Sequence, residues 1–191
     1  MSNLSSAYGK VLAAGANLAF STPMNTRAAR TEIVFIAADV SDPDVLLAGQ
    51  PDGSEIVWLD ADGDGVLQMA AVLGGRSGLD SIHVVSHGRA GALSLGTATL
   101  SLGTLDSYRG ELATIRHALR AGGDILLYGC NVAAGSEGTG LVNALADATG
   151  ADVAASTNAT GSAALGGDWT LEAASGPIES AGFAAETVLP A

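Results

Sequence analysis

Short hydrophobic runs alternate with longer stretches of helical spacing along this chain. The runs are rich in Val, Ile and Leu, and they occupy residues 32–38, 55–59, 81–86 and 124–128. Continuous apolar runs are typical of strands that are covered on both faces. Their alternation with helical segments is typical of a parallel sheet with crossover helices. The pattern therefore predicts an α/β domain with a mostly parallel sheet.

Caps, turns and spacing predict the remaining elements. Ser41-Asp-Pro-Asp combines a capping residue with a first-turn proline and predicts a helix start. Alternating apolar and small residues predict a small β-hairpin at 91–102, after the third strand. The other predicted elements are helices ending near 74–75 and spanning 105–119 and 138–149, a strand at 151–155, and a closing strand or hairpin at 161–172.

The length of 191 residues fits one domain of ordinary size. Ser, Asn, Thr and Gly dominate residues 1–30, which predict a leader or linker, and the pattern fades again after Gly176. We therefore expect the domain at 31–175 and a C-terminal tail at 176–191. No apolar run approaches the roughly 20 residues that cross a bilayer, so no membrane span is expected.

Charge narrows the range of partners. The chain has 20 acidic and 8 basic side chains and a formal net charge of -12. Because binding to nucleic acid depends on neutralising phosphates with Lys and Arg, nucleic acid and anionic membranes are poor partners. The single cysteine excludes an internal disulfide, so its thiol either packs in the core or takes part in chemistry.

A histidine and this cysteine follow two successive predicted strands. His87 follows the third run in Ser86-His87-Gly88, and Cys130 follows the fourth in Tyr128-Gly129-Cys130. If these strands are neighbours, both side chains meet at the carboxyl edge of the sheet, where ligands bind. A thiolate nucleophile beside an imidazole can cleave acyl bonds, and the amides of Gly88 and Cys130 can form an oxyanion hole. The alternative is that each residue packs at a strand end. His83 lies within the third strand and is predicted to be a core or interface histidine.

Two strand ends resemble the active-site motifs of the clan CD cysteine peptidases, which include caspases, gingipains, legumains and separases. These ends are Val84-Val-Ser-His-Gly88 and Leu126-Leu-Tyr-Gly-Cys130. More narrowly, residues 76–88, 123–135 and 166–169 resemble an uncharacterised domain found near the N-termini of giant bacterial repeat proteins. Those proteins include adhesins and calcium-binding repeat proteins exported by type I secretion. The resemblance covers about Thr31 to Glu172.

The resemblance implies a three-layer α/β/α sandwich of caspase-like (flavodoxin-like) type. It implies a His87/Cys130 dyad that hydrolyses peptide bonds in a peptide or protein, including self-processing of a larger parent chain. It also implies an extracellular or cell-surface location on a bacterium. Two alternatives are a non-catalytic, adhesin-associated folding or interaction module and a small-molecule hydrolase or transferase that uses the same two residues.

The resemblance further implies that the loops after the first, fourth and fifth strands build the substrate pocket. Asp39 follows the first strand, and an acidic residue there favours Arg or Lys in the substrate. The alternative is that Asp39 caps the following turn. Ser156, Thr157 and Asn158 follow the fifth strand, where they line the same pocket or form an ordinary polar turn.

The segment Asp60-Ala-Asp-Gly-Asp-Gly65 copies the start of a calcium loop. Its twelfth position is Ala71, where a bidentate Glu belongs, so two ligand oxygens are missing. The alternative is a helix start, because acidic residues stabilise helix N-termini. The peptidase hypothesis needs no cofactor and assigns no metal ligand, and calcium at this loop is a separate hypothesis.

Overall fold

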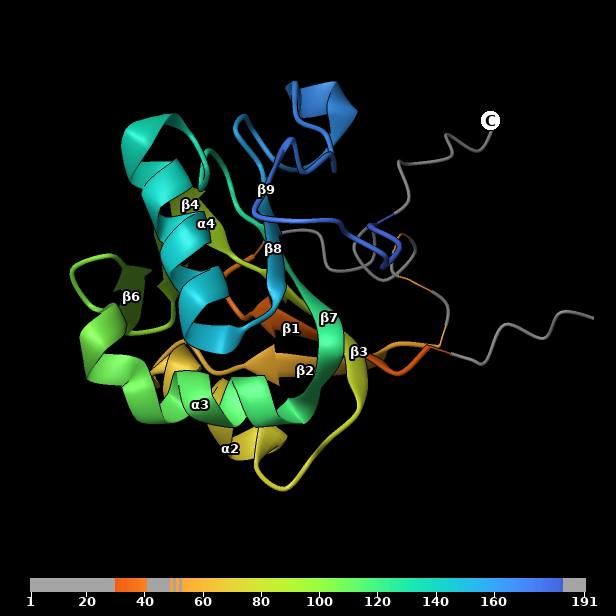
Figure 1. Ribbon diagram of the computed structural model, residues 1–191. Coiled ribbons are helices and arrows are strands. Elements are labelled where there is room, and N and C mark those ends of the chain that lie inside the picture. Colours follow the sequence, from red (N-terminus) through yellow and green to blue (C-terminus); the bar gives the residue numbers. More distant parts are fainter. Residues whose placement is uncertain (1–29, 41–48, 50, 52, 184–191) are drawn as a thin grey trace, which may run out of the picture.

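A six-stranded sheet forms the centre of the computed structural model, which describes residues 30–40, 49, 51 and 53–183 (Figure 1). The first five strands in spatial order run parallel, and the last pairs antiparallel. The parallel strands follow the flavodoxin-like order, in which the first strand lies between the second and third. The order is β2 (Glu55–Leu59), β1 (Glu32–Ala37), β3 (Leu79–Val85), β7 (Leu119–Tyr128), β8 (Asp152–Ala155) and β9 (Ala173–Ala174).

The burial of the strands follows their place in the sheet. All six residues of β1 are buried, and β3 is buried except for Asp80. The edge strand β2 is largely accessible, and its Trp58 is 46% exposed. The continuous apolar runs therefore mark central strands, as a sheet covered on both faces requires.

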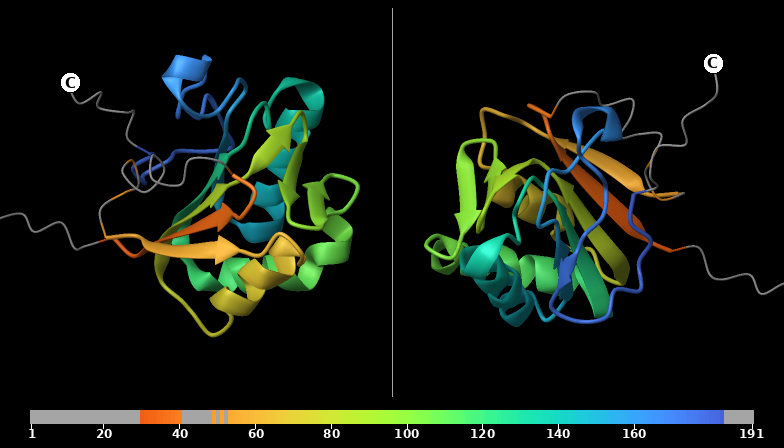
Figure 2. Two further views of the ribbon diagram at one scale, coloured as in Figure 1. Left: turned by 180° about the vertical axis from the view of Figure 1, so that it is seen from behind. Right: turned by 90° about the horizontal axis from the view of Figure 1, so that it is seen from above.

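The α-helices of the described chain cover one face of this sheet, as two further views show (Figure 2). A second, three-stranded antiparallel sheet, β4-β5-β6, packs beside them. The helices and the strands of the small sheet are α2 (Gly65–Leu73), η1 (Leu105–Tyr108), α3 (Arg109–Ala118), α4 (Gly135–Thr149), β4 (His87–Arg89), β5 (Ala92–Leu95) and β6 (Ala98–Ser101). The core on this side contains an apolar cavity whose lining includes Val66, Ile82 and Leu145.

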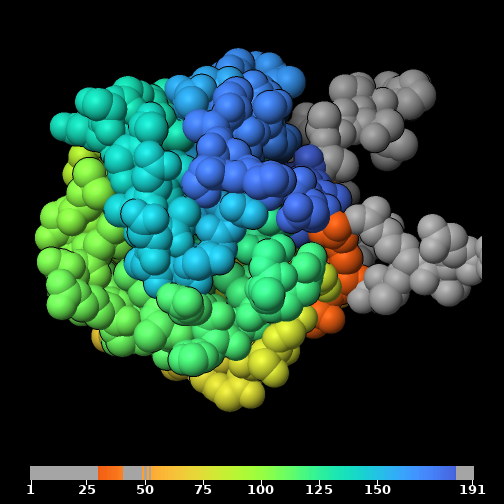
Figure 3. Space-filling model, in the orientation of Figure 1, coloured from red at the N-terminus to blue at the C-terminus, as the bar shows by residue number. Residues whose placement is uncertain are grey.

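The C-terminal part of the described chain covers the opposite face. Phe183 is 7% exposed and packs on Tyr128 with ring centroids 4.7 Å apart, and its N–H donates to the Tyr128 hydroxyl at 3.1 Å. The space-filling view shows this segment in blue, reaching the orange start of β1 (Figure 3). There, Arg30 donates to the hydroxyl of Ser180 at 2.9 Å. Burial of the tyrosine also raises the pKa of Tyr128.

The predicted fold class is confirmed, because the protein is an α/β domain whose mostly parallel sheet is flanked by helices. The small hairpin after the third strand is also present, as β5 and β6. The helix predicted from Ser41 and the leader predicted before residue 30 lie outside the described residues. No helix in the described part of the chain is long and apolar enough to cross a membrane.

Two predictions near the C-terminus need correction. The closing strand is β9, which begins at Ala173, whereas the segment predicted at 161–172 contains the short helix η2 (Ala163–Leu165) and an isolated bridge. The tail predicted from residue 176 belongs to the domain at least as far as Phe183. Its apolar residues are spaced irregularly, because they pack in an extended segment, and they therefore gave no periodic signal.

Candidate active site

The histidine and the cysteine lie at the carboxyl ends of two neighbouring parallel strands. Val85 of β3 and Tyr128 of β7 are partners in the register, and the amide of Ser86 donates to the Tyr128 oxygen at 3.0 Å. His87 and Cys130 each follow this pair by two residues. The prediction that the two strands are adjacent is confirmed. The site also lies beside the β1/β3 pair, where the strand order reverses and where doubly wound sheets bind ligands.

A main-chain oxygen orients the ring of His87. Its Nε2 lies 3.2 Å from the carbonyl oxygen of Asp39, in the loop after β1. Because a carbonyl can only accept, Nε2 carries the hydrogen of this bond and Nδ1 of the neutral ring is left as the proton acceptor. The carboxylate of Asp39 lies 3.9 Å from the same nitrogen. The side chain of His87 is 59% exposed and that of Asp39 is 50% exposed. Asp39 therefore contacts the predicted catalytic histidine.

The thiol of Cys130 points to another loop. Its Sγ lies 3.8 Å from the carbonyl oxygen of Thr160, and the residue is half-buried. No hydrogen bond joins Cys130 to His87 among the contacts of the described residues. The fold thus brings the two residues to one sheet edge and turns each toward a main-chain oxygen of a different segment.

A strained turn presents the cysteine. Asn131, the next residue, has a φ of 60°, and it is the non-glycine residue with positive φ in the described chain. Asn tolerates this left-handed conformation better than most residues, and such strain is often found at functional sites. The turn is tied to the loop after β8, because the amide of Asn131 donates to the Asn158 oxygen at 2.7 Å and that of Ala133 to the Ser156 oxygen at 2.9 Å.

Gly88 packs against this turn. A Cβ atom at Gly88 would lie 2.5 Å from a methyl group of Val132 and 3.0 Å from the main-chain oxygen of Cys130. The loops after β3 and β7 can approach this closely only because residue 88 has no side chain. The close approach also keeps the main chain of Gly88 beside that of Cys130. Their predicted role as oxyanion-hole donors remains a prediction.

The loop after β8 provides polar groups beside the cysteine turn. Ser156 is fully buried, and its hydroxyl donates to the side chain of Asn158 at 3.0 Å, so it shapes the loop from inside. The exposed Asn158 amide donates to Asp168 at 3.1 Å and to Glu172 at 2.7 Å. Hydrogen bonds from the amide of Thr170 and from Asn158 hold the pKa of Asp168 below its usual value. An anionic patch formed by Asp168 and Glu172 thus flanks the Cys130 turn.

Sequence reasoning missed several residues of this site. The role of the Asp39 carbonyl could not be read from the sequence, because main-chain contacts do not depend on residue type. Thr160, which accepts from the thiol, and Glu172 also gave no signal. Asp168 did have one, since it lies in the Gly166-Gly-Asp-Trp169 segment that resembles known domains.

The aspartate-rich loop at residues 60–65 starts a helix. Asp64 caps α2, because its Oδ1 accepts from the amides of Val66 and Leu67 at 2.9 and 3.1 Å. Its Oδ2 accepts from the hydroxyl of Tyr108 at 2.8 Å, and burial together with Asp64 raises the pKa of Tyr108. Both oxygens of Asp64 are therefore in use. In the described chain, three acidic residues close enough to share a metal ion occur elsewhere, at Asp124, Asp152 and Glu179.

The strand order and the paired loops define an α/β domain of flavodoxin-like strand order with a histidine and a cysteine at its carboxyl edge. The chain belongs to the family described as a domain of unknown function (DUF4347), whose model matches residues 33–189. No curated protein and no solved structure matches this chain. The family match includes the sheet, both site loops and the C-terminal segment beyond residue 176.

Proposed function

We propose that this domain is a cysteine endopeptidase with Cys130 as nucleophile and His87 as general base and acid. One observation carries the proposal: the ring of His87 is oriented by the Asp39 oxygen at the sheet edge where the Cys130 turn also lies. This bond fixes the tautomer in which Nδ1 accepts a proton. A nucleophile, a base and a group that orients the base are the three parts of nucleophilic catalysis.

The chemistry then follows the usual course for a thiol peptidase. Cys130 transfers its proton to Nδ1 of His87, and the sulfur attacks the carbonyl carbon of the scissile bond. The C–N bond breaks as His87 returns the proton to the leaving amine. Water then hydrolyses the thioester, with His87 accepting a proton from the water and returning it to the sulfur.

Attack requires the thiol to leave the Thr160 oxygen. The contact at 3.8 Å is long and involves a weak donor, so rotation about the Cα–Cβ bond of Cys130 costs little. Catalytic hydrogen bonds are often absent before substrate binds and form in the complex. The hydrogen bond from the amide of Asn131 to the Asn158 oxygen holds the backbone of the turn during this rotation.

The charges around the site favour a basic substrate. Asp39 lies beside His87, and Asp168 and Glu172 lie on the other side, around Asn158. An Arg or Lys side chain next to the scissile bond gains charge-assisted hydrogen bonds from these carboxylates. We infer that the substrate is a basic segment of a protein, and that a larger secreted parent chain is one such substrate.

Thiol alkylation tests the proposal directly, because Cys130 is the single cysteine of the chain. We would measure the rate of iodoacetamide labelling against pH for the parent protein and for His87→Ala. His117→Ala is the matched control, since His117 lies on the far helix α3. We expect labelling near neutral pH to fall about tenfold in His87→Ala and to stay unchanged in the control. Equal rates in all three proteins would contradict a working dyad.

A second function, that of a non-catalytic interaction module, is favoured by one observation. The ring of His87 contacts the main-chain oxygen of Asp39, and the thiol of Cys130 contacts that of Thr160. Each side chain thus has a partner that does not involve the other side chain. Incubation with peptide libraries containing Arg and Lys separates the two functions. Cleavage that is lost in Cys130→Ala supports the peptidase, whereas an inert parent protein with an ordinary thiol supports the module.

A further inference from the structure

A row of polar residues crosses the sheet on the face that the C-terminal segment covers. Glu32 of β1 pairs with Ser81 of β3, Ser81 with Asp124 of β7, and Asp124 with Asp152 of β8. Residues in one register row point to the same face of a sheet. Glu179 lies over this row, because its amide donates to Asp124 at 3.1 Å. Glu32, Asp124, Asp152 and Glu179 thus lie along one row at the end of the sheet opposite the candidate active site.

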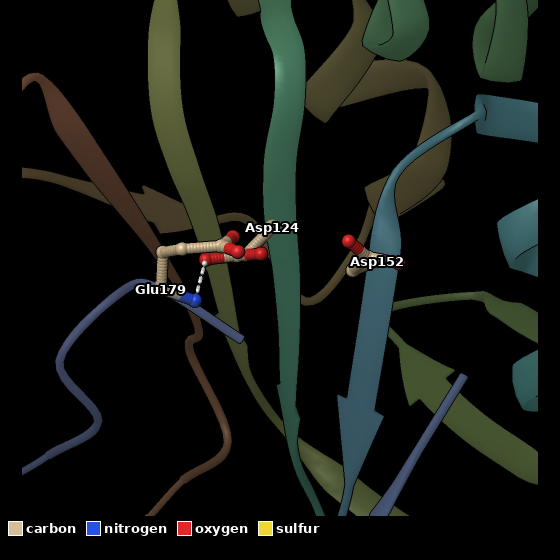
Figure 4. Close-up of side chains that lie close together, drawn as sticks. All are labelled: Asp124, Asp152 and Glu179. Carbon is tan, nitrogen blue, oxygen red and sulfur yellow. Dashed lines mark hydrogen bonds between the residues drawn. The ribbon is translucent and has the colours of Figure 1, made fainter. Parts of the chain in front are cut away.

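Three of these carboxylates converge on one point. Asp124, Asp152 and Glu179 each offer an oxygen, and the three oxygens lie within 4.8 Å of one another. Figure 4 shows the carboxylate of Asp124 between the other two, with Glu179 beside it and Asp152 on the neighbouring strand. Gly176 makes room for this arrangement, since a Cβ atom there would lie 2.0 Å from an oxygen of Asp152.

Asp124 supplies an independent sign of a missing partner. The residue is fully buried, and its Oδ2 accepts from the amides of Glu179 and Ser180 at 3.1 and 2.8 Å. Its Oδ1 is also buried and has no hydrogen-bond partner. An unpaired buried carboxylate oxygen is costly, and like charges at this distance repel each other. A positive group would compensate this charge, and none of the ion pairs of the described residues supplies one.

The arginines Arg30 and Arg120 are engaged with side chains outside the group of Asp124, Asp152 and Glu179. Arg30 contacts Glu32 and Ser180, and Arg120 pairs with Asp80. The ion pairs of the described residues include none with Asp124, Asp152 or Glu179. The negative charge at this point is thus not compensated by a basic side chain in the described structure.

We propose that Asp124, Asp152 and Glu179 bind a divalent cation, and that this cation is calcium. Carboxylate oxygens select hard cations such as Ca²⁺ and Mg²⁺ over metals that prefer nitrogen or sulfur. Calcium accepts an irregular oxygen shell, whereas Mg²⁺ demands near-octahedral geometry. Glu179 comes from an irregular, exposed segment, and Asp152 is half-buried, so water completes the shell.

The cation would fasten the C-terminal segment to the sheet. Glu179 lies on that segment, whereas Asp124 and Asp152 lie on β7 and β8. Four residues beyond Glu179, Phe183 packs on Tyr128, which is two residues before Cys130. Cation binding at one end of β7 would therefore stabilise the cover over the strand that precedes the cysteine.

Calcium titration of chelator-treated protein tests this site. The parent protein would be compared with Asp152→Asn, Glu179→Gln and the control Asp147→Asn, an exposed acid on α4. We expect calcium at about 100 times the dissociation constant to raise the parent's melting temperature by about 5–10 °C. Calorimetry should give one site, weakened at least about tenfold in Asp152→Asn and Glu179→Gln and unchanged in Asp147→Asn.

Two further measurements define the outcome. Asp62→Asn in the aspartate-rich loop should leave calcium binding unchanged, and magnesium should shift the melting temperature less than calcium does. Circular dichroism of each variant in chelator establishes that it is folded before titration. No calcium response in the parent, or a response that survives in both Asp152→Asn and Glu179→Gln, would overturn the proposal.

Discussion

The ring of His87 and the main-chain oxygen of Asp39 lie 3.2 Å apart beside the β1/β3 pair, where the strand order reverses. The group that orients the ring is therefore part of the backbone, whereas the carboxylate of the same residue lies farther from this nitrogen, at 3.9 Å. Orientation of the histidine and the proposed attraction of a basic substrate can be separated by mutation at one position.

The variant Asp39→Asn removes the charge of the carboxylate and keeps the main-chain oxygen that orients the ring. The carbonyl remains, so we expect the alkylation rate of Cys130 to stay within about twofold of the parent rate. Cleavage of Arg and Lys peptides should fall about tenfold, because one charge partner is lost. The alkylation rate of Cys130 and the rate of peptide cleavage would be measured on the same preparation of each protein, parent and variant. A loss of alkylation as large as that in His87→Ala would show that the carboxylate orients the ring.

Asn131 supports the cysteine turn through its backbone conformation. Asn131→Gly should leave stability within about 0.5 kcal/mol of the parent, because glycine adopts a φ of 60° without strain. Asn131→Val should cost about 1–2 kcal/mol, since a β-branched residue is strained there. Urea denaturation measures both. Equal stability of the two variants would mean that the turn relaxes to a negative φ.

Two helix glycines differ in the space around them. A Cβ atom at Gly138 in α4 would lie 2.2 Å from the main chain of Ala133, just after the cysteine turn, whereas nothing lies within 4 Å at Gly110 in α3. We expect Gly138→Ala to destabilise the protein by about 1–3 kcal/mol and Gly110→Ala to stabilise it by up to about 1 kcal/mol. Thermal unfolding measures the difference, and a stabilising Gly138→Ala would contradict the close approach of Gly138 to Ala133.

Much of the fold could be predicted because the central strands are buried on both faces. The hydrophobic runs that form β1, β3 and β7 are continuous and apolar. Because these runs alternate with helical segments, the sequence predicts a parallel sheet with His87 and Cys130 at one edge. His83 was predicted to be a core or interface histidine and is fully buried. These features follow from local composition and chain order.

The rest depends on contacts between distant segments. The row that joins Glu32, Asp124 and Asp152 exists only in the strand register, which the sequence does not reveal. The position of Glu179 above that row depends on an extended segment without periodicity. Main-chain partners such as the oxygens of Asp39 and Thr160 are equally invisible, because any residue type supplies them.

The amino end of the sheet provides a prediction about pH. Asp80 accepts from the amide of Thr31 at 2.8 Å and from Arg120 at 2.6 Å. The Thr31 bond, followed by the Arg120 guanidinium, holds the pKa of Asp80 below its ordinary value of 3.8. A depressed pKa means that the stabilisation is complete above the unfolded value and is lost as pH falls through the folded one.

We therefore expect Asp80→Asn to lower the free energy of unfolding by about 1 kcal/mol at neutral pH. The difference from the parent should shrink below pH 3.8. Asp106→Asn is the control, because Asp106 and Arg109 form an exposed pair and its loss should have little effect. Urea denaturation across acidic pH measures all three proteins, and a difference that persists unchanged at low pH would refute the assignment.

The contact between Arg30 and Ser180 joins positions 150 residues apart. One face of the first strand is thus covered by residues that the ribosome adds near the end of the described chain. During synthesis, the partly built sheet exposes Val34 and Ile36 until the segment ending at Phe183 has emerged. Long-range pairing of this kind slows folding and leaves apolar surface open to aggregation. We therefore expect the nascent domain to complete its structure late.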